Sequence, residues 1–279
     1  MKRKWKIMLY IGIPILLAMI VWIIWGNKAL ELNAYTVTSA DLPSSFDGFR
    51  IAHVSDLHNT EMGENNEKLL TMLRDAKPDM IAITGDLIDS RSTDIPLALR
   101  FVEEAMKIAP CYFVSGNHEL RIAEYEEFLQ SLSDLGVVIL DNTQTEIIRN
   151  GEKITVMGLR DPNLEMQNFD GDAPAIVQQY LHAEDGFVLL LSHRPELFEV
   201  YAKNEIDLAL TGHAHGGQFR FPLIGGLIAP QQGLFPEYDA GWFVQGDTRM
   251  IISRGIGNSA FPFRFNNRPE VILITLKTA

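Results

Sequence analysis

The chain has 279 residues, 47% of them hydrophobic, which is enough for one large domain or two small ones. Its formal net charge is −12, from 24 basic and 36 acidic side chains, so it repels nucleic-acid backbones and we expect no nucleic-acid partner. The single cysteine, Cys111, excludes an intrachain disulfide and a thiolate-rich zinc site. Because Cys111 lies in a strand-like run, we expect it to be a buried apolar residue.

The first segment is typical of a membrane anchor. Residues 7–25 are nineteen positions without a formal charge, and a helix of that length spans roughly 28 Å, close to the hydrocarbon thickness of a bilayer. Tryptophans at both ends suit the membrane interfaces, and four basic residues among the first six predict a cytoplasmic N-terminus. The pattern therefore predicts a single-pass protein of the cell membrane with an extracytoplasmic body. The alternatives are a cleaved signal peptide, which would make the protein secreted, and a buried helix of a soluble domain.

The rest of the chain alternates between short apolar runs and helical patterns. We divide the chain into an anchor (1–26), an exposed linker with a first strand (27–46) and one domain (47–279). Strands are expected at 49–55, 80–84, 111–114, 137–140, 145–149, 154–159, 187–191 and 208–210, and helices at 64–76, 95–109, 125–135, 175–182 and 196–203. After residue 215, strands are expected at 218–221, 242–244, 250–253 and 271–276. This alternation predicts an α/β fold in which helices cover sheets.

Polar clusters follow five of the expected strands where each strand ends. They are Asp56-Leu57-His58, Gly85-Asp86-Leu87-Ile88-Asp89, Gly116-Asn117-His118-Glu119, His193 and Gly212-His213-Ala214-His215. Ligands on neighbouring strands converge at one edge of a sheet, and carboxylate, imidazole and amide groups without sulfur suit Mn, Fe or Zn ions. The ligands outnumber what one ion can use, so the pattern predicts two divalent or trivalent metal ions, about 3.5–4 Å apart, that share a carboxylate.

These five blocks, in this order, resemble the signature of the calcineurin-like metallophosphoesterases over roughly residues 46–278. Within that superfamily the chain looks like the membrane-linked bacterial phosphodiesterases of the YaeI and YkuE type, because of Gly216-Gly217-Gln218 and the segment 253–259. The resemblance implies a four-layer α/β/β/α sandwich. It also implies a hydrolase that cleaves a P–O bond of a phosphodiester or pyrophosphate by metal-bound hydroxide. The anchor adds a lipid-linked phosphate ester to the candidate substrates.

The resemblance also implies a role for each residue of the blocks. The first metal would be held by Asp56, His58 and His215. Asp86 would bridge to a second metal, held by Asn117, His193 and His213. His118 would bind no metal but would stabilise the phosphoryl group and protonate the leaving oxygen. Glu119 is expected to support the ligands, and Asp89 either to do the same or to cap its turn.

Other residues receive a structural interpretation or stay open. His53 within a strand, His182 at a helix end and Asp161 in a turn are expected to be structural. Arg254, Arg264 and Arg268 are candidates for binding a second phosphate or the leaving group, although we expect at least two of them on the exposed surface. In the loop 219–242, half or more of the large apolar side chains are expected in the core, and the rest would form an apolar lip near the site.

Two other function classes remain open. One is a protein phosphatase or a nucleotidase with the same site and another substrate. The second is a non-catalytic scaffold whose metal site holds the fold; such a protein would usually lack a ligand block or the acid, and none is missing in this sequence.

Overall fold

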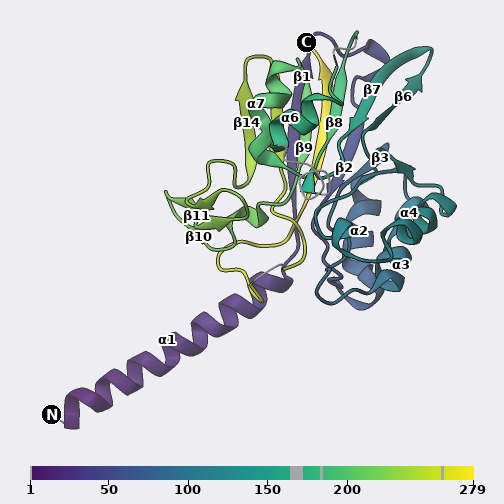
Figure 1. Cartoon of the computed structure of the whole chain (residues 1–279). Helices are drawn as coiled ribbons and strands as arrows, with labels where there is room; N and C mark the ends of the chain where they lie inside the picture. The colour runs from purple at the N-terminus through teal and green to yellow at the C-terminus, as the bar shows by residue number, and fades with distance from the viewer. Residues whose placement is uncertain (1, 164–171, 183–184, 259–260) are drawn as a thin grey trace.

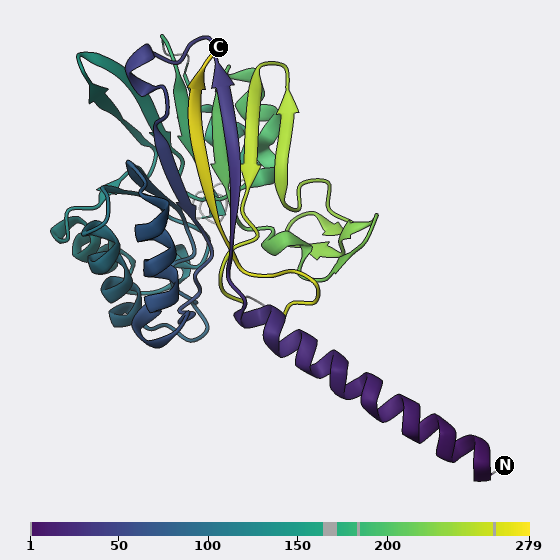
Figure 2. The ribbon, with the colours of Figure 1, turned by 180° about the vertical axis from the view of Figure 1, so that it is seen from behind.

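Two six-stranded mixed sheets form the body of the computed structural model, which describes residues 2–163, 172–182, 185–258 and 261–279 (Figures 1 and 2). The first sheet has the strand order β1 (Glu31–Ser39), β16 (Glu270–Thr278), β2 (Arg50–Val54), β3 (Met80–Thr84), β4 (Cys111–Val114) and β5 (Val138–Ile139). The second has the order β14 (Gly241–Gln245), β15 (Thr248–Ile252), β9 (Leu208–Thr211), β8 (Val188–Leu191), β7 (Glu152–Gly158) and β6 (Thr143–Arg149). The pairs β16–β2, β14–β15 and β6–β7 are antiparallel, and the other neighbours are parallel.

The two sheets pack against each other through a shared apolar core. Met80 and Ala82 of β3 belong to this core, and so do Leu189 and Leu191 of β8 in the second sheet. Because successive side chains of a strand point to opposite faces, the residues between them face outward and are buried under helices. Burial on both faces explains why these strands appear in the sequence as continuous apolar runs.

Helices cover the outer faces of both sheets. On the first sheet lie α2 (Glu67–Ala76), α3 (Ile95–Met106) and α4 (Tyr125–Asp134), and on the second lie α6 (Ala173–Gln178) and α7 (Phe198–Lys203). Helix α2 buries Leu69, Leu70 and Leu73, which share one side of the helix. Among the described residues, five short 3-10 turns complete the connections: η1 (Ser44–Phe46), η2 (Glu64–Asn66), η3 (Glu119–Arg121), η4 (Pro195–Leu197) and η5 (His215–Gly217).

The helix expected at 175–182 has other bounds in the structure. Helix α6 begins at Ala173 rather than at residue 175, because Asp172 accepts a hydrogen bond from the Ala175 N–H and Pro174 fits the first turn. It ends at Gln178, so the exposed His182 lies beyond the helix. The segment 27–46 contains the expected first strand, β1, which is hydrogen-bonded along its whole length to β16 as an edge strand of the first sheet. The division into anchor, linker and domain stays a prediction.

The loop after η5 is built from two small hairpins rather than from core side chains. They are β10 (Arg220–Phe221) with β11 (Gly225–Gly226), and β12 (Ile228–Ala229) with β13 (Gly233–Leu234). The expectation that half or more of the large apolar residues here are core is wrong, since the exposed ones are Phe221, Leu223, Ile224, Leu234 and Phe235. Close backbone contacts at glycines, such as Gly217 against Gly226, hold the hairpins to the body instead.

Helix α1 (Lys2–Lys28) extends away from the body (Figures 1 and 2). Residues Tyr10–Lys28 have a mean hydropathy of 1.9 with no residue buried, so by length and composition this helix could cross a membrane, as could a signal sequence. The helix is tied to the body at its last turn, where Asn27 Nδ2 donates to the Arg264 carbonyl oxygen at 2.9 Å. The guanidinium of Arg268 also lies 5.2 Å from the Trp25 ring centroid. The basic side chains predicted to fix the orientation, on residues 2–6, lie outside the described side chains.

Candidate metal centre

The predicted site residues follow two sets of parallel strands, β2, β3 and β4 in the first sheet and β8 and β9 in the second. Eight of them are at most 5% exposed: Asp56, His58, Asp86, Asn117, His118, His193, His213 and His215. Buried polar groups are costly unless they are paired or bind an ion. So many buried polar side chains on adjoining loops therefore indicate a functional site.

The backbone at five of these residues is in the left-handed region. The φ angles are 52° at Asp56, 46° at His58, 53° at Asp86, 66° at His213 and 48° at His215. This conformation costs a residue with a side chain roughly 1–2 kcal/mol and tends to cluster at functional sites. Hydrogen bonds between the loops hold it in place, such as the Asp56 N–H to the Gly85 carbonyl at 3.0 Å and the His58 N–H to the Asp86 carbonyl at 2.9 Å.

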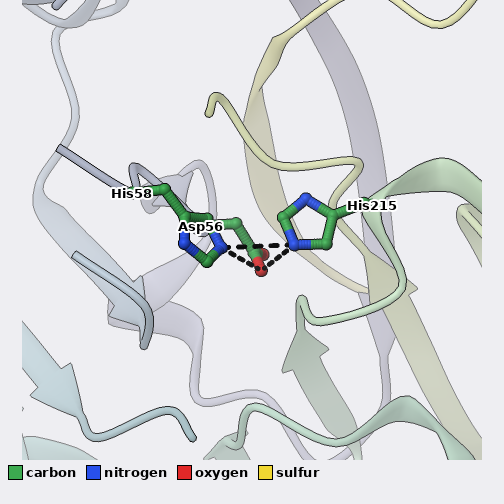
Figure 3. A group of neighbouring side chains, drawn as sticks. All are labelled: Asp56, His58 and His215. Carbon is green, nitrogen blue, oxygen red and sulfur yellow. Dashed lines mark hydrogen bonds and ion pairs between the residues drawn. The ribbon is translucent and has the colours of Figure 1, made fainter. Parts of the chain in front are cut away.

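Asp56, His58 and His215 point toward one another and form the first cluster (Figure 3). The Asp56 Oδ1 atom lies 3.3 Å from His215 Nε2 and 3.8 Å from His58 Nε2. The two imidazole Nε2 atoms are 3.2 Å apart. Three donor atoms from loops after β2 and β9 thus surround one point.

Asp86, His193 and His213 form the second cluster, and Asp86 connects it to the first. The Asp86 Oδ2 atom lies 3.2 Å from His193 Nε2 and 3.4 Å from His58 Nε2. His193 Nε2 is also 3.0 Å from His213 Nδ1. The Thr84 carbonyl oxygen accepts a hydrogen bond from His193 Nδ1 at 2.7 Å, which leaves the lone pair of Nε2 directed at the cluster.

A cavity of about 200 Å³ opens onto these clusters. Its lining residues are Asp86, Arg91, Asn117, His118, Arg121, His213, His215, Pro230 and Gln231. A larger cavity of about 660 Å³ lies elsewhere and is lined by acidic residues that include Glu196, Glu199 and Glu237. None of the clustered side chains lines this larger cavity, so we assign the smaller cavity to the candidate metal site.

Comparison with known proteins identifies the family. The model of the calcineurin-like phosphoesterase family matches residues 49–217. The chain belongs to this family. It is 29% identical over 258 residues to the uncharacterized metallophosphoesterase YkuE of Bacillus subtilis, covering 89% of this chain and 86% of YkuE. It is 28% identical over 238 residues to the phosphodiesterase YaeI of Escherichia coli, covering 82% of each.

A transmembrane protein with a metallophosphoesterase domain from Danio rerio is also similar, with 28% identity over 247 residues, 85% of this chain and 55% of that protein. This calcineurin-like phosphoesterase is therefore a metal-dependent phosphohydrolase with an α/β fold of mixed sheets, as the resemblance in its sequence implied. The family fold implies bound divalent metal ions, and the clusters around Asp86 supply candidate ligands.

Three observations show that the donor set of this phosphoesterase fits metal ions. The buried Oδ1 atom of Asn117 has no hydrogen-bond partner among the described residues, which is the state of a ligand atom aimed at a cation. Imidazole nitrogens face each other at 3.0 and 3.2 Å in the two clusters, an arrangement that a shared cation stabilises. The ligand atoms are carboxylate, imidazole and amide groups, which suit Mn, Fe or Zn.

The protonation states of the clustered histidines also favour metal binding. Burial lowers the pKa of His215 to about 3 and lowers the pKa of His213 well below its usual value, so both rings are neutral and can offer lone pairs. Burial also acts to lower the pKa of His193, but the Asp86 carboxylate outweighs it and raises that pKa to about 10. A cation held between His193 and Asp86 would replace this proton and compensate the same carboxylate charge.

Glu119 supports the backbone of the phosphoesterase site. The fully buried carboxylate accepts hydrogen bonds from the N–H groups of Asp86 and Gly116, each at 2.8 Å, and of Ile88 at 3.2 Å. Burial, together with the neighbouring Asp86 carboxylate, raises the pKa of Glu119 to about 7. Glu119 thus fixes the loops that carry Asp86 and Asn117 without facing the cavity.

Asp89 and His118 lie side by side at the edge of the clusters. The Asp89 carboxylate caps its own turn by accepting from the Arg91 N–H at 2.9 Å, and it also lies 3.8 Å from His58 Nδ1 and 3.5 Å from His118 Nδ1. Asp89 therefore caps its turn beside two histidines of the site, and its support of the metal ligands stays a prediction. The Ser90 N–H donates to His118 Nδ1 at 3.0 Å.

The expectation that at least two of the three C-terminal arginines are exposed is wrong. Arg264 is 2% exposed and donates to the carbonyl oxygens of Arg254 and Gly257, with Nη2 3.3 Å from His215 Nδ1. The Arg254 side chain is 15% exposed and pairs with Glu31 and Glu270. With their donors engaged inside the fold, Arg264 supports a candidate ligand and Arg254 joins β1 to β16. Ser259, at the end of the segment 253–259, lies outside the described residues.

Neither of the two remaining histidines belongs to a metal-ligand cluster of the described residues, but His182 does not lie at a helix end as expected. His53 is fully buried, with its Nε2 atom 2.8 Å from Thr84 Oγ1, and burial lowers its pKa to about 3. His182 is exposed and lies outside both clusters.

Sequence reasoning missed two contacts of the candidate ligands. Arg194, next to His193, is 2% exposed and forms a two-pronged ion pair with Asp161, with Nη2 3.0 Å from Oδ1. Asp161 also forms the expected turn by accepting from the Asn163 N–H at 2.9 Å. Gln231, on the turn between β12 and β13, contacts His213 Nε2 through its side-chain oxygen. The charge of Arg194 directly after His193 could have indicated an ion pair next to the site. Nothing in the sequence around Gln231 indicates its contact with His213.

Proposed function

We propose that this protein is a membrane-anchored phosphoesterase that uses two metal ions to hydrolyse the P–O bond of a phosphodiester or a pyrophosphate, with lipid-linked esters among its substrates. The observation that carries the proposal is the position of the Asp86 carboxylate, 3.4 Å or less from an imidazole nitrogen of each cluster. A shared carboxylate at that position is what a two-metal site requires. We also infer that the stacked helices and sheets form the four-layer α/β/β/α sandwich expected from the family resemblance.

We assign the ligands by cluster. One metal would be held by Asp56, His58, Asp86 and His215, and the other by Asp86, Asn117, His193 and His213. When bound, such a pair of cations acts as a Lewis acid on the phosphoryl group and lowers the pKa of an attacking water. Because Asn117 is neutral, the ligand set carries little negative charge. Glu119 would hold the loops that carry Asp86 and Asn117 in place.

His118 would protonate the leaving oxygen. In the neutral ring His118 Nδ1 accepts from the Ser90 N–H, which can only donate, so the proton of that form is on Nε2. To act as an acid the ring must take up a second proton on Nδ1, toward the Asp89 Oδ1 atom at 3.5 Å. Burial lowers the pKa of His118, which makes its protonated form a stronger acid than an exposed histidine. Its place in the cavity wall beside Asp86 and Asn117 puts it within reach of a bound phosphate ester.

The hairpins beside the cavity support a substrate or surface of lipid character. Leu223 is 108% exposed, and Ile224, Leu234 and Phe235 are between 62% and 65% exposed on β10–β11 and β12–β13. The turn between β12 and β13 supplies Gln231 to the cavity wall. The β10–β11 hairpin also lies on the side of the body from which α1 extends (Figures 1 and 2). Exposed apolar side chains near a reaction cavity suit work at a bilayer surface, with the N-terminus cytoplasmic and the body outside.

The proposal is tested with the full-length protein in detergent. We expect hydrolysis of bis-(p-nitrophenyl) phosphate to exceed that of p-nitrophenyl phosphate when Mn²⁺ is present, and both to be lost when the metal is chelated. Higher activity toward the monoester would favour a phosphatase or nucleotidase instead. A protein that binds two equivalents of metal but hydrolyses neither compound would be a non-catalytic scaffold, and the proposal would be wrong.

A further inference from the structure

We propose that Arg121, together with Arg91, forms a subsite for a second phosphate on the leaving-group side of the cavity, so that the bond cleaved is the P–O–P bond of a substituted pyrophosphate. This inference rests on the proposed function and narrows its substrate class. It concerns residues that lie outside the two metal-ligand clusters.

Two arginines line the cavity wall beside His118. Arg121 is at the end of η3, three residues after His118, and both line the cavity together with Arg91. Arg91 is held by Asp89, with Nη2 2.6 Å from Oδ2 and Nε 3.0 Å from Oδ1, so its charge is largely compensated. Arg121 is exposed, and its side chain makes no hydrogen bond or ion pair with any part of the chain that the structure describes.

An uncompensated guanidinium in this cavity is conspicuous in a protein with a net charge of −12. Guanidinium groups bind phosphate oxygens through paired hydrogen bonds, and anions are attracted most strongly where the positive charge is unpaired. The Arg121 N–H donates to the His118 carbonyl oxygen at 3.2 Å, and both residues line the same cavity. The ligand of Arg121 therefore lies next to the oxygen that His118 would protonate.

The chemistry of the leaving group separates the two substrate classes. An alcohol leaving from a simple diester departs as an alkoxide and needs a proton above all. A phosphate leaving from a pyrophosphate departs with its charge spread over several oxygens, and a fixed cation stabilises that charge. A free guanidinium next to His118 thus favours a pyrophosphate substrate over a simple diester.

The reaction is a hydrolysis and needs no other reactant than water. The water oxygen forms a bond to the attacked phosphorus, and the bond from that phosphorus to the bridging oxygen breaks. The bridging oxygen keeps the electron pair and leaves as part of the second phosphate, which Arg121 would bind and His118 can protonate. The remaining protons of water are released as the two phosphate monoesters ionise.

The test compares two substrates in the full-length protein with Mn²⁺: ADP-ribose as a substituted pyrophosphate and bis-(p-nitrophenyl) phosphate as a simple diester. Losing a charged hydrogen bond of about 1.5–3 kcal/mol lowers kcat/KM by roughly 10- to 100-fold. We therefore expect Arg121→Ala to lower the ratio of kcat/KM for ADP-ribose to that for the diester by about that factor, and Arg121→Lys to restore part of it. The matched control is Arg100→Ala, an exposed arginine on α3, which should leave the ratio unchanged.

A binding measurement provides a readout that is independent of turnover. By calorimetry, Arg121→Ala should weaken the binding of methylenediphosphonate more than that of inorganic phosphate. An unchanged substrate ratio, equal losses for both ligands, or a wild-type protein that cleaves the diester but not ADP-ribose would overturn the subsite. A wild-type protein that cleaves neither would instead refute the proposed function itself, and the subsite with it.

Discussion

Replacing Glu119 by glutamine tests whether the loops of the site depend on one buried acceptor group. Glu119 Oε2 accepts from the N–H groups of Asp86 and Gly116, and Oε1 accepts from the N–H of Ile88. A glutamine can keep its oxygen toward the first two, but its amide nitrogen then faces the Ile88 N–H, and two donors meet. One buried N–H without an acceptor costs about 1–3 kcal/mol. For a protein of this size, we expect the Tm to fall by roughly 2–12 °C.

The measurement is differential scanning calorimetry of the full-length protein in detergent with a chelator present, so that metal binding does not compensate the loss. Glu124→Gln is the matched control, because Glu124 is exposed five residues further along the chain and should leave the Tm unchanged. Glu119→Ala removes the acceptors of all three N–H groups and should lower the Tm further than Glu119→Gln. If Glu119→Gln unfolds at the same temperature as Glu124→Gln, the assigned role of Glu119 is wrong.

Three further predictions concern His118, Cys111 and the orientation in the membrane. His118→Asn should keep the metal content, measured by mass spectrometry of the metals, while kcat falls about 10²- to 10⁴-fold; loss of the metals would show that His118 is a ligand. Cys111, whose pKa burial raises to about 12, should resist iodoacetamide at pH 8 in the folded protein and react only in denaturant, as intact-mass measurements would reveal. A reporter enzyme fused after Ala279 should be active only outside the cytoplasm, and activity inside would contradict the proposed orientation.

The parts of the fold that the sequence predicts correctly are those set by local pattern. Strand β3 is a continuous apolar run that ends directly before Gly85 and Asp86, and the structure has the strand at the expected residues. The convergence of Asp86 and His58 follows from the same rule, since they come after the parallel neighbours β2 and β3, whose carboxyl ends share one edge. His193 follows β8 of the other sheet, so its approach to Asp86 depends on how the two sheets pack. Their roles as metal ligands remain proposals, because proximity alone does not establish binding.

The parts that the sequence does not predict depend on pairs that are distant along the chain. Arg254 pairs with Glu31, which is 223 residues away, and no local pattern indicates that the two charges are partly buried against each other. The same holds for Arg264, whose guanidinium is enclosed by its own loop and by His215. An arginine next to aromatic residues in a Gly- and Pro-rich segment is usually exposed, so the expectation of surface positions was reasonable and still wrong. Burial of a charge depends on its partners, and those are known only from the fold.

The overall charge of −12 does not prevent the proposed reaction, because the charge that a substrate meets is local. Of the seven proposed ligands, only Asp56 and Asp86 carry a negative charge, while the histidines and Asn117 are neutral donors. Two divalent cations in that set would leave a charge of about +2 at the centre, and Arg121 adds one more at the rim. Acidic groups elsewhere on the surface are screened within about 8 Å at physiological salt. The neutral ligands therefore allow an acidic protein to attract a phosphate ester, and a second carboxylate in place of Asn117 would reduce that attraction.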